Sequence, residues 1–187
     1  GPAAAIANDL ARARLYGKLR HSASRRIVTL AILILALVTL QRLGELVISR
    51  YNTRRLLAQG AIEIAPGHYP FVVMIHAAWL TTLWIWGRGQ DVNLVALSIF
   101  ILLQALRVWV LATLGSRWTT RIIVLPNAPM VTSGPYRYLS HPNYAIVAAE
   151  IAILPLALHL VLIASIFTVL NALALVIRIR AESRALA

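Results

Sequence analysis

The chain has 187 residues, about one domain's length, and 60 % of them are hydrophobic. Soluble domains average about 45–50 %, and with only 13 % charged residues the composition excludes a disordered chain and argues against an ordinary soluble enzyme. The net charge of +12 comes from Lys and Arg between long apolar runs, which indicates contact with anionic lipid rather than nucleic acid. The chain has no Cys, which excludes disulfides and thiolate chemistry.

The first third of the chain predicts a basic segment followed by a membrane span. Gly1-Pro2 is typical of the scar that a protease leaves when a tag is removed, and residues 3–26 are basic and Ala-rich, as in an interfacial amphipathic helix or a frayed tail. Residues 27–187 are expected to form a single transmembrane domain. Its first span is Ile27–Ile48, about 33 Å of helix. The basic stretch Arg50–Arg55 and a loop follow.

Four further segments complete the predicted fold. Phe71–Trp86 and Asn93–Leu114 are the second and third apolar runs, and Trp118–Leu125 is rich in β-branched residues, which predicts an extended segment over the membrane face. Tyr144–Leu158, short for a full crossing, and Leu160–Ile177 are joined by so short a link that a tight hairpin is expected. The sequence therefore predicts an all-α integral membrane protein with about five transmembrane helices and an N-terminal interfacial helix.

The distribution of Lys and Arg predicts the orientation. The side that carries the loops after the first, third and fifth runs holds nine of them, and the other side holds seven, mostly in the N-terminal tail. The positive-inside rule then places the first side in the cytoplasm. A tail that lies on the cytoplasmic surface would reverse this assignment.

Polar residues recur at helical spacing inside the apolar runs, where they are costly and indicate functional sites. Arg42 and Glu45 can pair one turn apart, and Arg107, beside Gln104, needs a partner or a wet cavity. Further stripe members are Ser49, Asn52, His76, Asn143, Glu150, Asn171, Arg178 and Glu182. Each could simply hold the bundle together by hydrogen bonds. The set as a whole favours a buried polar pocket near one membrane face.

The loop before the fourth run is dense in signals. Gly134-Pro135 fixes a turn, and Pro142 stands at a favourable first helical position, which puts His141 at the N-cap. A helix N-terminus offers free N–H groups to a carboxylate. The alternative is a plain helix entry with tyrosines at head-group depth.

These residues resemble a known family. The motif GPYRYLSHPNY with the later RIRAES is similar to the isoprenylcysteine carboxyl methyltransferases, which are integral membrane enzymes. Further segments resemble a bacterial branch associated with O-methylation of long-chain alkylpyrones and alkylresorcinols: Gln41 to Asn52, Gly60 to Glu63, His68 to Pro70, and Leu114 to Pro126.

The resemblance implies S-adenosylmethionine as the cofactor, entering from the cytosol, with the lipid substrate entering from the bilayer of a bacterial inner membrane. Glu182 suits the amino group of the methionine moiety and Arg178 its carboxylate. No GxGxxG follows a strand, so a Rossmann methyltransferase domain is not supported. The implied cofactor residues are Tyr136, His141, Pro142, Asn143, Tyr144, Arg178, Arg180 and Glu182.

A hydroxyl substrate must lose its proton during methyl transfer, so a base is expected. Glu45 and His141 are the candidate bases, and Arg107 completes the predicted catalytic set. His76 is a third candidate base, for which the favoured alternative is a hydrogen-bonded histidine that only packs between helices. The predicted substrate-binding residues are Arg42, Asn52, His76, Arg121, Glu150 and Asn171.

Two other functions stay open. One is carboxyl methylation of an isoprenylcysteine-like substrate, although Ser140 stands where that family often has Arg and the tail after Glu182 is short. The other is a non-catalytic membrane protein, such as a transporter subunit or an assembly factor, which should not bind S-adenosylmethionine. The five histidines show no metal-ligand spacing, so no metal site is predicted.

Overall fold

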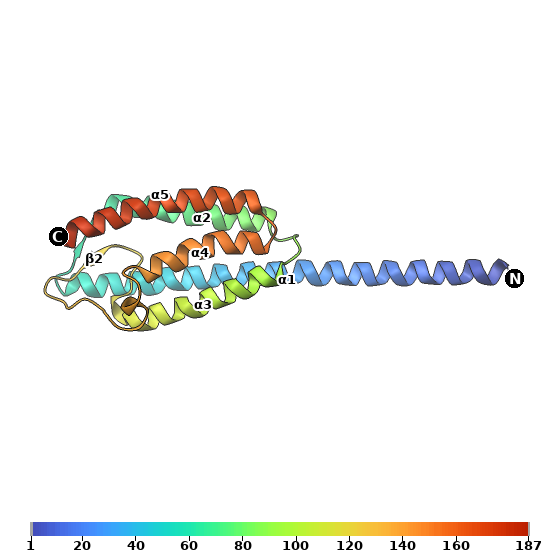
Figure 1. Cartoon of the computed structure of the whole chain (residues 1–187), viewed down its shortest axis with the longest axis horizontal. Helices are drawn as coiled ribbons and strands as arrows, with labels where there is room; N and C mark the ends of the chain where they lie inside the picture. The colour runs from blue at the N-terminus through green and yellow to red at the C-terminus, as the bar shows by residue number, and fades with distance from the viewer. Residues whose placement is uncertain (1, 187) are drawn as a thin grey trace.

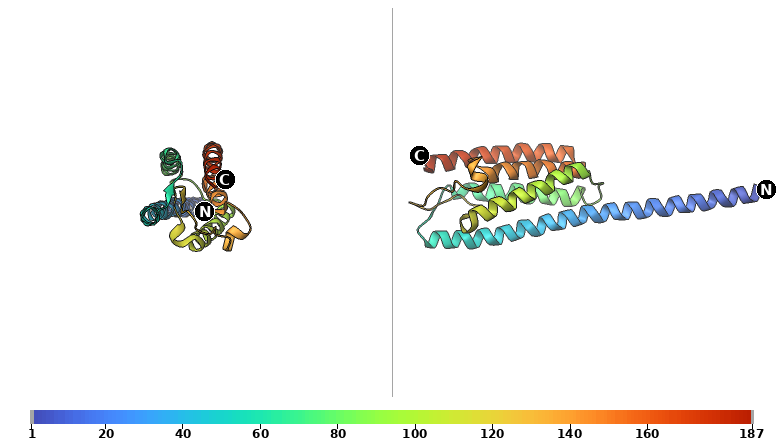
Figure 2. Two further views of the ribbon diagram at one scale, coloured as in Figure 1. Left: turned by 90° about the vertical axis from the view of Figure 1, so that its left-hand side faces the viewer. Right: turned by 60° about the horizontal axis from the view of Figure 1, so that its bottom comes forward.

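Five long helices make up the computed structural model, which describes the backbone of residues 2–186 and the side chains of residues 29–67, 69–182 and 184. Figures 1 and 2 show them packed along one another as a bundle. The prediction of an interfacial segment over residues 1–26 rests on side chains outside the described residues. The helices are α1 (Pro2–Ala58), α2 (Tyr69–Trp86), α3 (Leu94–Leu114), α4 (Pro142–Ala157) and α5 (Val161–Leu186).

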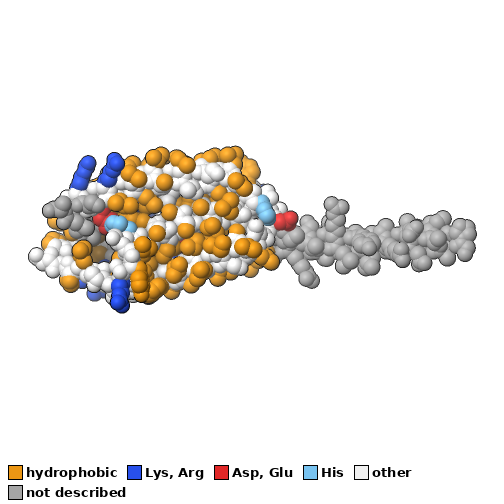
Figure 3. All heavy atoms as spheres, in the orientation of Figure 1, with side chains coloured by type: hydrophobic (Ala, Val, Ile, Leu, Met, Phe, Trp, Pro, Cys, Tyr) orange, Lys and Arg blue, Asp and Glu red, His pale blue; other side chains and the backbone are white. Residues whose placement is uncertain are grey.

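The outer surface of the bundle is that of an integral membrane protein. Figure 3 shows hydrophobic side chains over the flank of the described part, with arginines gathered at one end. The all-α membrane class is thus confirmed. Of the five predicted spans, α4 is too short to qualify. Four described segments are long and apolar enough to cross a membrane: Thr29–Ala58, Tyr69–Trp86, Leu94–Arg117 and Val161–Glu182.

Helix α1 runs beyond its apolar part. The sequence predicted that the span ends at Ile48, but the helix continues through the basic stretch to Ala58. The stretch Arg50–Arg55 contains neither Gly nor Pro, and its three arginines favour the helical conformation, so nothing in it stops the helix. Asn52 and Leu56 are buried in this extra part. Hydropathy therefore marked the edge of the apolar stretch and not the end of the helix.

The other helix ends follow from local chemistry. The side chain of Asn93 caps α3 by accepting hydrogen bonds from the backbone N–H groups of Val95 (3.0 Å) and Ala96 (3.1 Å). Helix α4 ends two residues after Pro155, whose carbonyl accepts from the N–H groups of Leu158 and Leu160 at 3.0 and 2.9 Å. These bonds close the turn that leads into α5.

One end of the bundle gathers the features that concern function. Helices α1, α3 and α5 end there, and α2 and α4 begin there, at the left in Figure 1. Two short strands, β1 (Ile62–Glu63) and β2 (Ile123–Val124), pair antiparallel, with Ile62 opposite Val124. Strand β2 lies within the predicted extended segment. The 3-10 helices η1 (Pro66–His68), η2 (Gly115–Arg117) and η3 (Gly134–Arg137) complete the connections.

Candidate functional site

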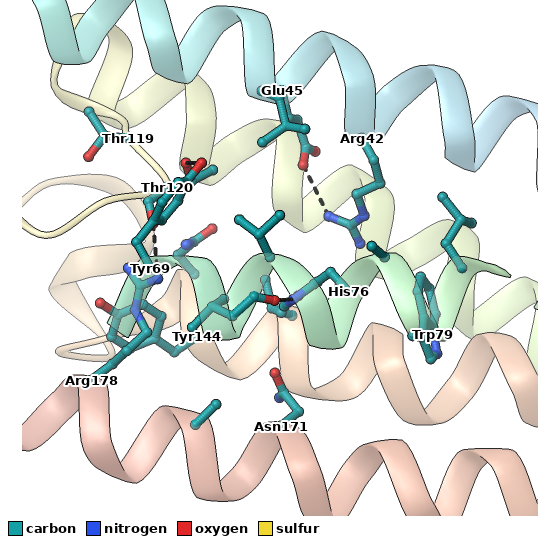
Figure 4. Close-up of a pocket in the computed structure, with 18 of the residues that line it drawn as sticks. Arg42, Glu45, Tyr69, His76, Trp79, Thr119, Thr120, Tyr144, Asn171 and Arg178 are labelled. Carbon is teal, nitrogen blue, oxygen red and sulfur yellow. Dashed lines mark hydrogen bonds and ion pairs between the residues drawn. The ribbon is translucent and has the colours of Figure 1, made fainter. Parts of the chain in front are cut away.

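A cavity of about 260 Å³ opens between α1, α2 and α5, with further lining from α3, α4 and residues 118–120. Figure 4 shows the side chains of α1 and α5 facing each other across α2. The predicted convergence of polar stripes is confirmed, because each of the five helices contributes a polar side chain. The predicted site residues that line the cavity are Arg42, Glu45, His76, Arg107, Asn143, Tyr144, Asn171 and Arg178.

An ion quartet of Arg42, Glu45, Arg107 and Glu150 joins α1, α3 and α4 beside the cavity. Arg107 donates to both oxygens of Glu45 and, at 2.7 Å, to Glu150. Arg42 donates to Glu150 at 2.7 Å and to Glu45 at 3.0 Å, so the predicted one-turn pair is confirmed. The two positive and two negative charges cancel, and Glu150 is fully buried. Glu150 does not line the cavity; it anchors the two arginines that do.

The carboxylate of Glu45 is saturated with hydrogen bonds. Its Oε1 accepts from Gln41 at 3.0 Å and from the Nε of Arg107, and its Oε2 accepts from Arg42 and Arg107. A carboxylate has about four lone-pair sites. Four donors therefore occupy them, which leaves Glu45 a poor acceptor for a substrate proton.

The α5 side of the cavity carries a cation with a spare donor. Arg178 is 8 % exposed; its Nη1 donates to the carbonyl of Thr120 at 2.9 Å, and its guanidinium lies 5.3 Å from the ring centre of Tyr144. The Nε of Arg178 and the Oδ1 of Asn143 are both buried without a hydrogen-bond partner. Buried polar atoms are rarely left in this state, so this pair indicates a place for a polar ligand.

A cluster at the start of α4 adjoins the cavity. The hydroxyl of Tyr144 donates to Glu182 at 2.9 Å, and the ring of His141 stacks on that of Tyr144 with centres 5.4 Å apart. His141 stands at the predicted N-cap, with its Nδ1 3.9 Å from Glu182. Burial raises the pKa of nearby Tyr136 to about 12, so its phenol stays a neutral hydrogen-bond donor. Pro142 is buried at the first helical position.

Residues 118–120 form a strap across this end of the cavity. Thr120 shares a hydrogen bond with Ser49 at 2.7 Å and reaches the hydroxyl of Tyr69 at 3.3 Å. The amide of Asn52 donates to the carbonyl of Trp118 at 2.8 Å. The prediction that Asn52 binds substrate is corrected, because its side chain holds the strap and does not line the cavity.

Two further predicted residues lie outside the cavity. Arg180 is exposed, because two residues along a helix turn it by about 200° from Arg178. Arg121 pairs with Glu63 at 2.8 Å and stacks over the ring of Tyr69 at 4.4 Å, so its charge is already engaged. The structure brings neither arginine to the cavity wall.

Sequence reasoning gave no site role to several residues that line the cavity, among them Tyr69, Trp79, Trp118 and Thr120. Tyr69 belongs to the His-Tyr-Pro segment that carries part of the family resemblance, and Trp79 shares a helical face with His76. Those signals could have identified both residues. Trp118 and Thr120 come from a loop, and a loop sequence does not indicate which helices it crosses.

The chain is similar to one known protein family and to uncharacterized proteins. The isoprenylcysteine carboxyl methyltransferase (ICMT) family matches residues 95–187, which include α4, α5 and nearly all of α3. The uncharacterized protein YpbQ of Bacillus subtilis (strain 168) is 35 % identical over 159 residues, 82 % of this chain and 95 % of that protein. An uncharacterized protein of Haemophilus influenzae is 28 % identical over 108 residues, 55 % of this chain and 63 % of that protein.

No solved structure matches the chain. The family match covers the α4 entry and the end of α5, where the unpartnered Oδ1 of Asn143 and the unpartnered Nε of Arg178 lie. The relative from Bacillus subtilis extends the similarity over most of the chain. The chain belongs to the isoprenylcysteine carboxyl methyltransferase family of membrane methyltransferases.

Proposed function

We propose that this protein is a membrane O-methyltransferase that uses S-adenosylmethionine to methylate a hydroxyl of a long-chain lipid of the alkylresorcinol or alkylpyrone type. Members of the family use this cofactor, which supplies a methyl group on a positively charged sulfur. The site in this chain would bind and orient the reactants and keep water away from them. The cofactor and the substrate class are supported by different parts of the cavity.

The residues at the α4 entry fit the polar part of the cofactor. Its methionine moiety carries a carboxylate and an amino group. The buried, unpartnered Nε of Arg178 suits the carboxylate, and the unpartnered Oδ1 of Asn143 suits the amino group. Glu182, which already accepts from Tyr144, adds a negative charge beside this position. The orphaned donor and acceptor are thus complementary to the two charged groups of the ligand.

The opposite side of the cavity fits an apolar chain. Leu43 of α1 and Val73 of α2 line the cavity, and they are 55 % and 36 % exposed. That outer surface is the apolar flank of a membrane protein. The cavity therefore reaches the lipid between α1 and α2, which favours a lipophilic substrate over a water-soluble one.

The balance of charge favours a hydroxyl over a carboxylate substrate, and this observation carries the proposal. Arg42 and Arg107 line the cavity, but Glu45 and Glu150 neutralise both. Among the described residues of the cavity wall, Arg178 is the one cation without a carboxylate partner. If Arg178 holds the carboxylate of the cofactor, no cation is left for a carboxylate of the substrate.

Methyl transfer by the purified protein in lipid nanodiscs tests this function. Radiolabelled S-adenosylmethionine would be supplied with an alkylresorcinol, an alkylpyrone or a farnesylcysteine analogue. We expect label on the two hydroxyl substrates. Label on the farnesylcysteine alone would establish carboxyl methylation instead, and failure to bind the cofactor would support a non-catalytic protein.

A further inference from the structure

His76 combines a fixed tautomer with a place on the cavity wall. It lies on α2, and its Nδ1 is 2.8 Å from the carbonyl oxygen of Val72, one turn earlier. A carbonyl oxygen can only accept a hydrogen bond, so Nδ1 carries the hydrogen. In the neutral ring, Nε2 therefore keeps a free lone pair. Figure 4 shows His76 between Arg42 and Glu45 on one side and Asn171 on the other.

The cavity offers few alternatives as a proton acceptor. Among its described lining residues, Glu45 provides the one carboxylate and His76 the one imidazole. All lone-pair sites of Glu45 are filled by donors from Gln41, Arg42 and Arg107. The other predicted base, His141, stacks on Tyr144 outside the cavity lining. By elimination, the Nε2 of His76 is the available base.

We propose that His76 is a catalytic residue whose Nε2 takes the proton of the substrate hydroxyl, an inference that rests on the proposed O-methylation. The hydroxyl oxygen forms the new bond to the methyl carbon while the carbon–sulfur bond breaks, with its electron pair remaining on sulfur. The proton moves from the hydroxyl to Nε2 and then to water. The products are a methyl ether and the demethylated cofactor. The hydrogen bond that Nδ1 donates to the carbonyl oxygen of Val72 holds the imidazole ring in position.

The test compares two substrates of different acidity in the variant His76→Asn. The amide of Asn can still donate to the Val72 carbonyl, but it offers no basic nitrogen. With an alkylresorcinol, whose phenol is a weak acid, we expect turnover to fall about 100-fold or more, as for the loss of a general base. With an alkylpyrone, whose 4-hydroxyl is far more acidic and ionises without help, we expect a loss below about tenfold.

Two controls accompany this comparison. His159→Asn makes the same change at an exposed residue in the link between α4 and α5, where φ is 57° and Asn is well tolerated. It should leave both turnover rates unchanged. Isothermal titration should give His76→Asn a cofactor dissociation constant within twofold of the wild-type value, which also shows that the variant is folded.

The outcomes separate the two proposals. Wild-type protein that methylates neither hydroxyl substrate overturns the proposed function and the role of His76 with it. Active wild-type protein with an unchanged His76→Asn variant overturns the role of His76 alone. An equal loss on both substrates also overturns it, because a residue that only packs the helix would not distinguish a phenol from an acidic enol.

Discussion

Single residues decide which charges reach the cavity. Arg178 and Arg180 belong to one short motif, yet one lines the cavity and the other is exposed. The helical period explains the difference. It also explains why Arg178 and Glu182, four residues apart, both turn toward the start of α4 and Tyr144. The motif alone predicts the same role for Arg178 and Arg180, whereas the geometry of the helix places only Arg178 at the cavity.

The contrast between these arginines gives a paired prediction. Arg178→Gln should raise the dissociation constant of S-adenosylmethionine at least tenfold, because it removes the buried cation expected to hold the carboxylate; tenfold corresponds to about 1.4 kcal/mol. Arg180→Gln removes the same charge from an exposed position and should change the constant less than twofold. Isothermal titration in detergent measures both. Equal weakening would mean that the net charge, and not a contact, drives binding.

At the scale of elements, the ion quartet is the polar link between α1, α3 and α4. Removing one member leaves an uncompensated buried charge, which costs about 3–5 kcal/mol, whereas removing a balanced pair costs much less. Glu150→Gln should therefore lower the thermal denaturation midpoint strongly. The double variant Arg107→Met with Glu150→Leu leaves the balanced pair of Arg42 and Glu45 and should recover most of the loss.

The exposed pair of Glu63 and Arg121 provides the control for this series. Both side chains are partly exposed, so Glu63→Gln should cost about 1 kcal/mol or less. Denaturation of all variants would be followed in the same detergent. A double variant that is less stable than Glu150→Gln would show that charge balance is not what the quartet contributes.

The elements were predictable to different degrees. The apolar run Phe71–Trp86 predicted α2 to within two residues, because the hydrophobic stretch and the helix end together. In α1 they do not, since its helix passes through the basic stretch. The pairing of Ile62 with Val124 joins residues far apart in the chain, so no local sequence pattern could have predicted it.

The site was predictable as far as helical spacing reaches. Spacing brought Arg42 to Glu45, and the depth of Arg107 in its apolar run predicted that it needs a partner or a wet cavity. It could not show that Glu45 is that partner or that its oxygens are saturated, because those contacts come from other helices. Because the oxygens of Glu45 are saturated with hydrogen bonds, we assign the role of the base to His76. The sequence alone had made His76 only the third candidate.

At the scale of the whole molecule, the charges predict an orientation. The exposed arginines of the described part gather at the end where α1, α3 and α5 finish, and Arg88 lies at the other end. The positive-inside rule puts the crowded end, and with it the α4 entry, in the cytoplasm. The gathered arginines are Arg50, Arg54, Arg55, Arg117, Arg137, Arg180 and Arg184.

The lack of native cysteine makes this orientation directly measurable. Asp91→Cys and Ser140→Cys place single thiols at exposed positions at opposite ends of the bundle. In intact bacterial cells, a membrane-impermeant maleimide should label the first and not the second. In permeabilised cells, the maleimide should label both introduced cysteines. The reverse pattern would place the α4 entry outside the cytoplasm.

We expect the ion quartet also to constrain how the chain enters the bilayer during synthesis. Arg42 and Glu45 lie one turn apart on α1, so Glu45 neutralises Arg42 within the same helix. Helix α1 can therefore pass from the translocation machinery into the bilayer without a partner helix. Arg107 of α3 and Glu150 of α4 have no such neighbour in their own helices. Each would face hydrocarbon as a bare charge if released singly. We therefore expect α3 to remain at the translocon until α4 has been synthesised. Membrane insertion and the structure of the site would then depend on the same four side chains.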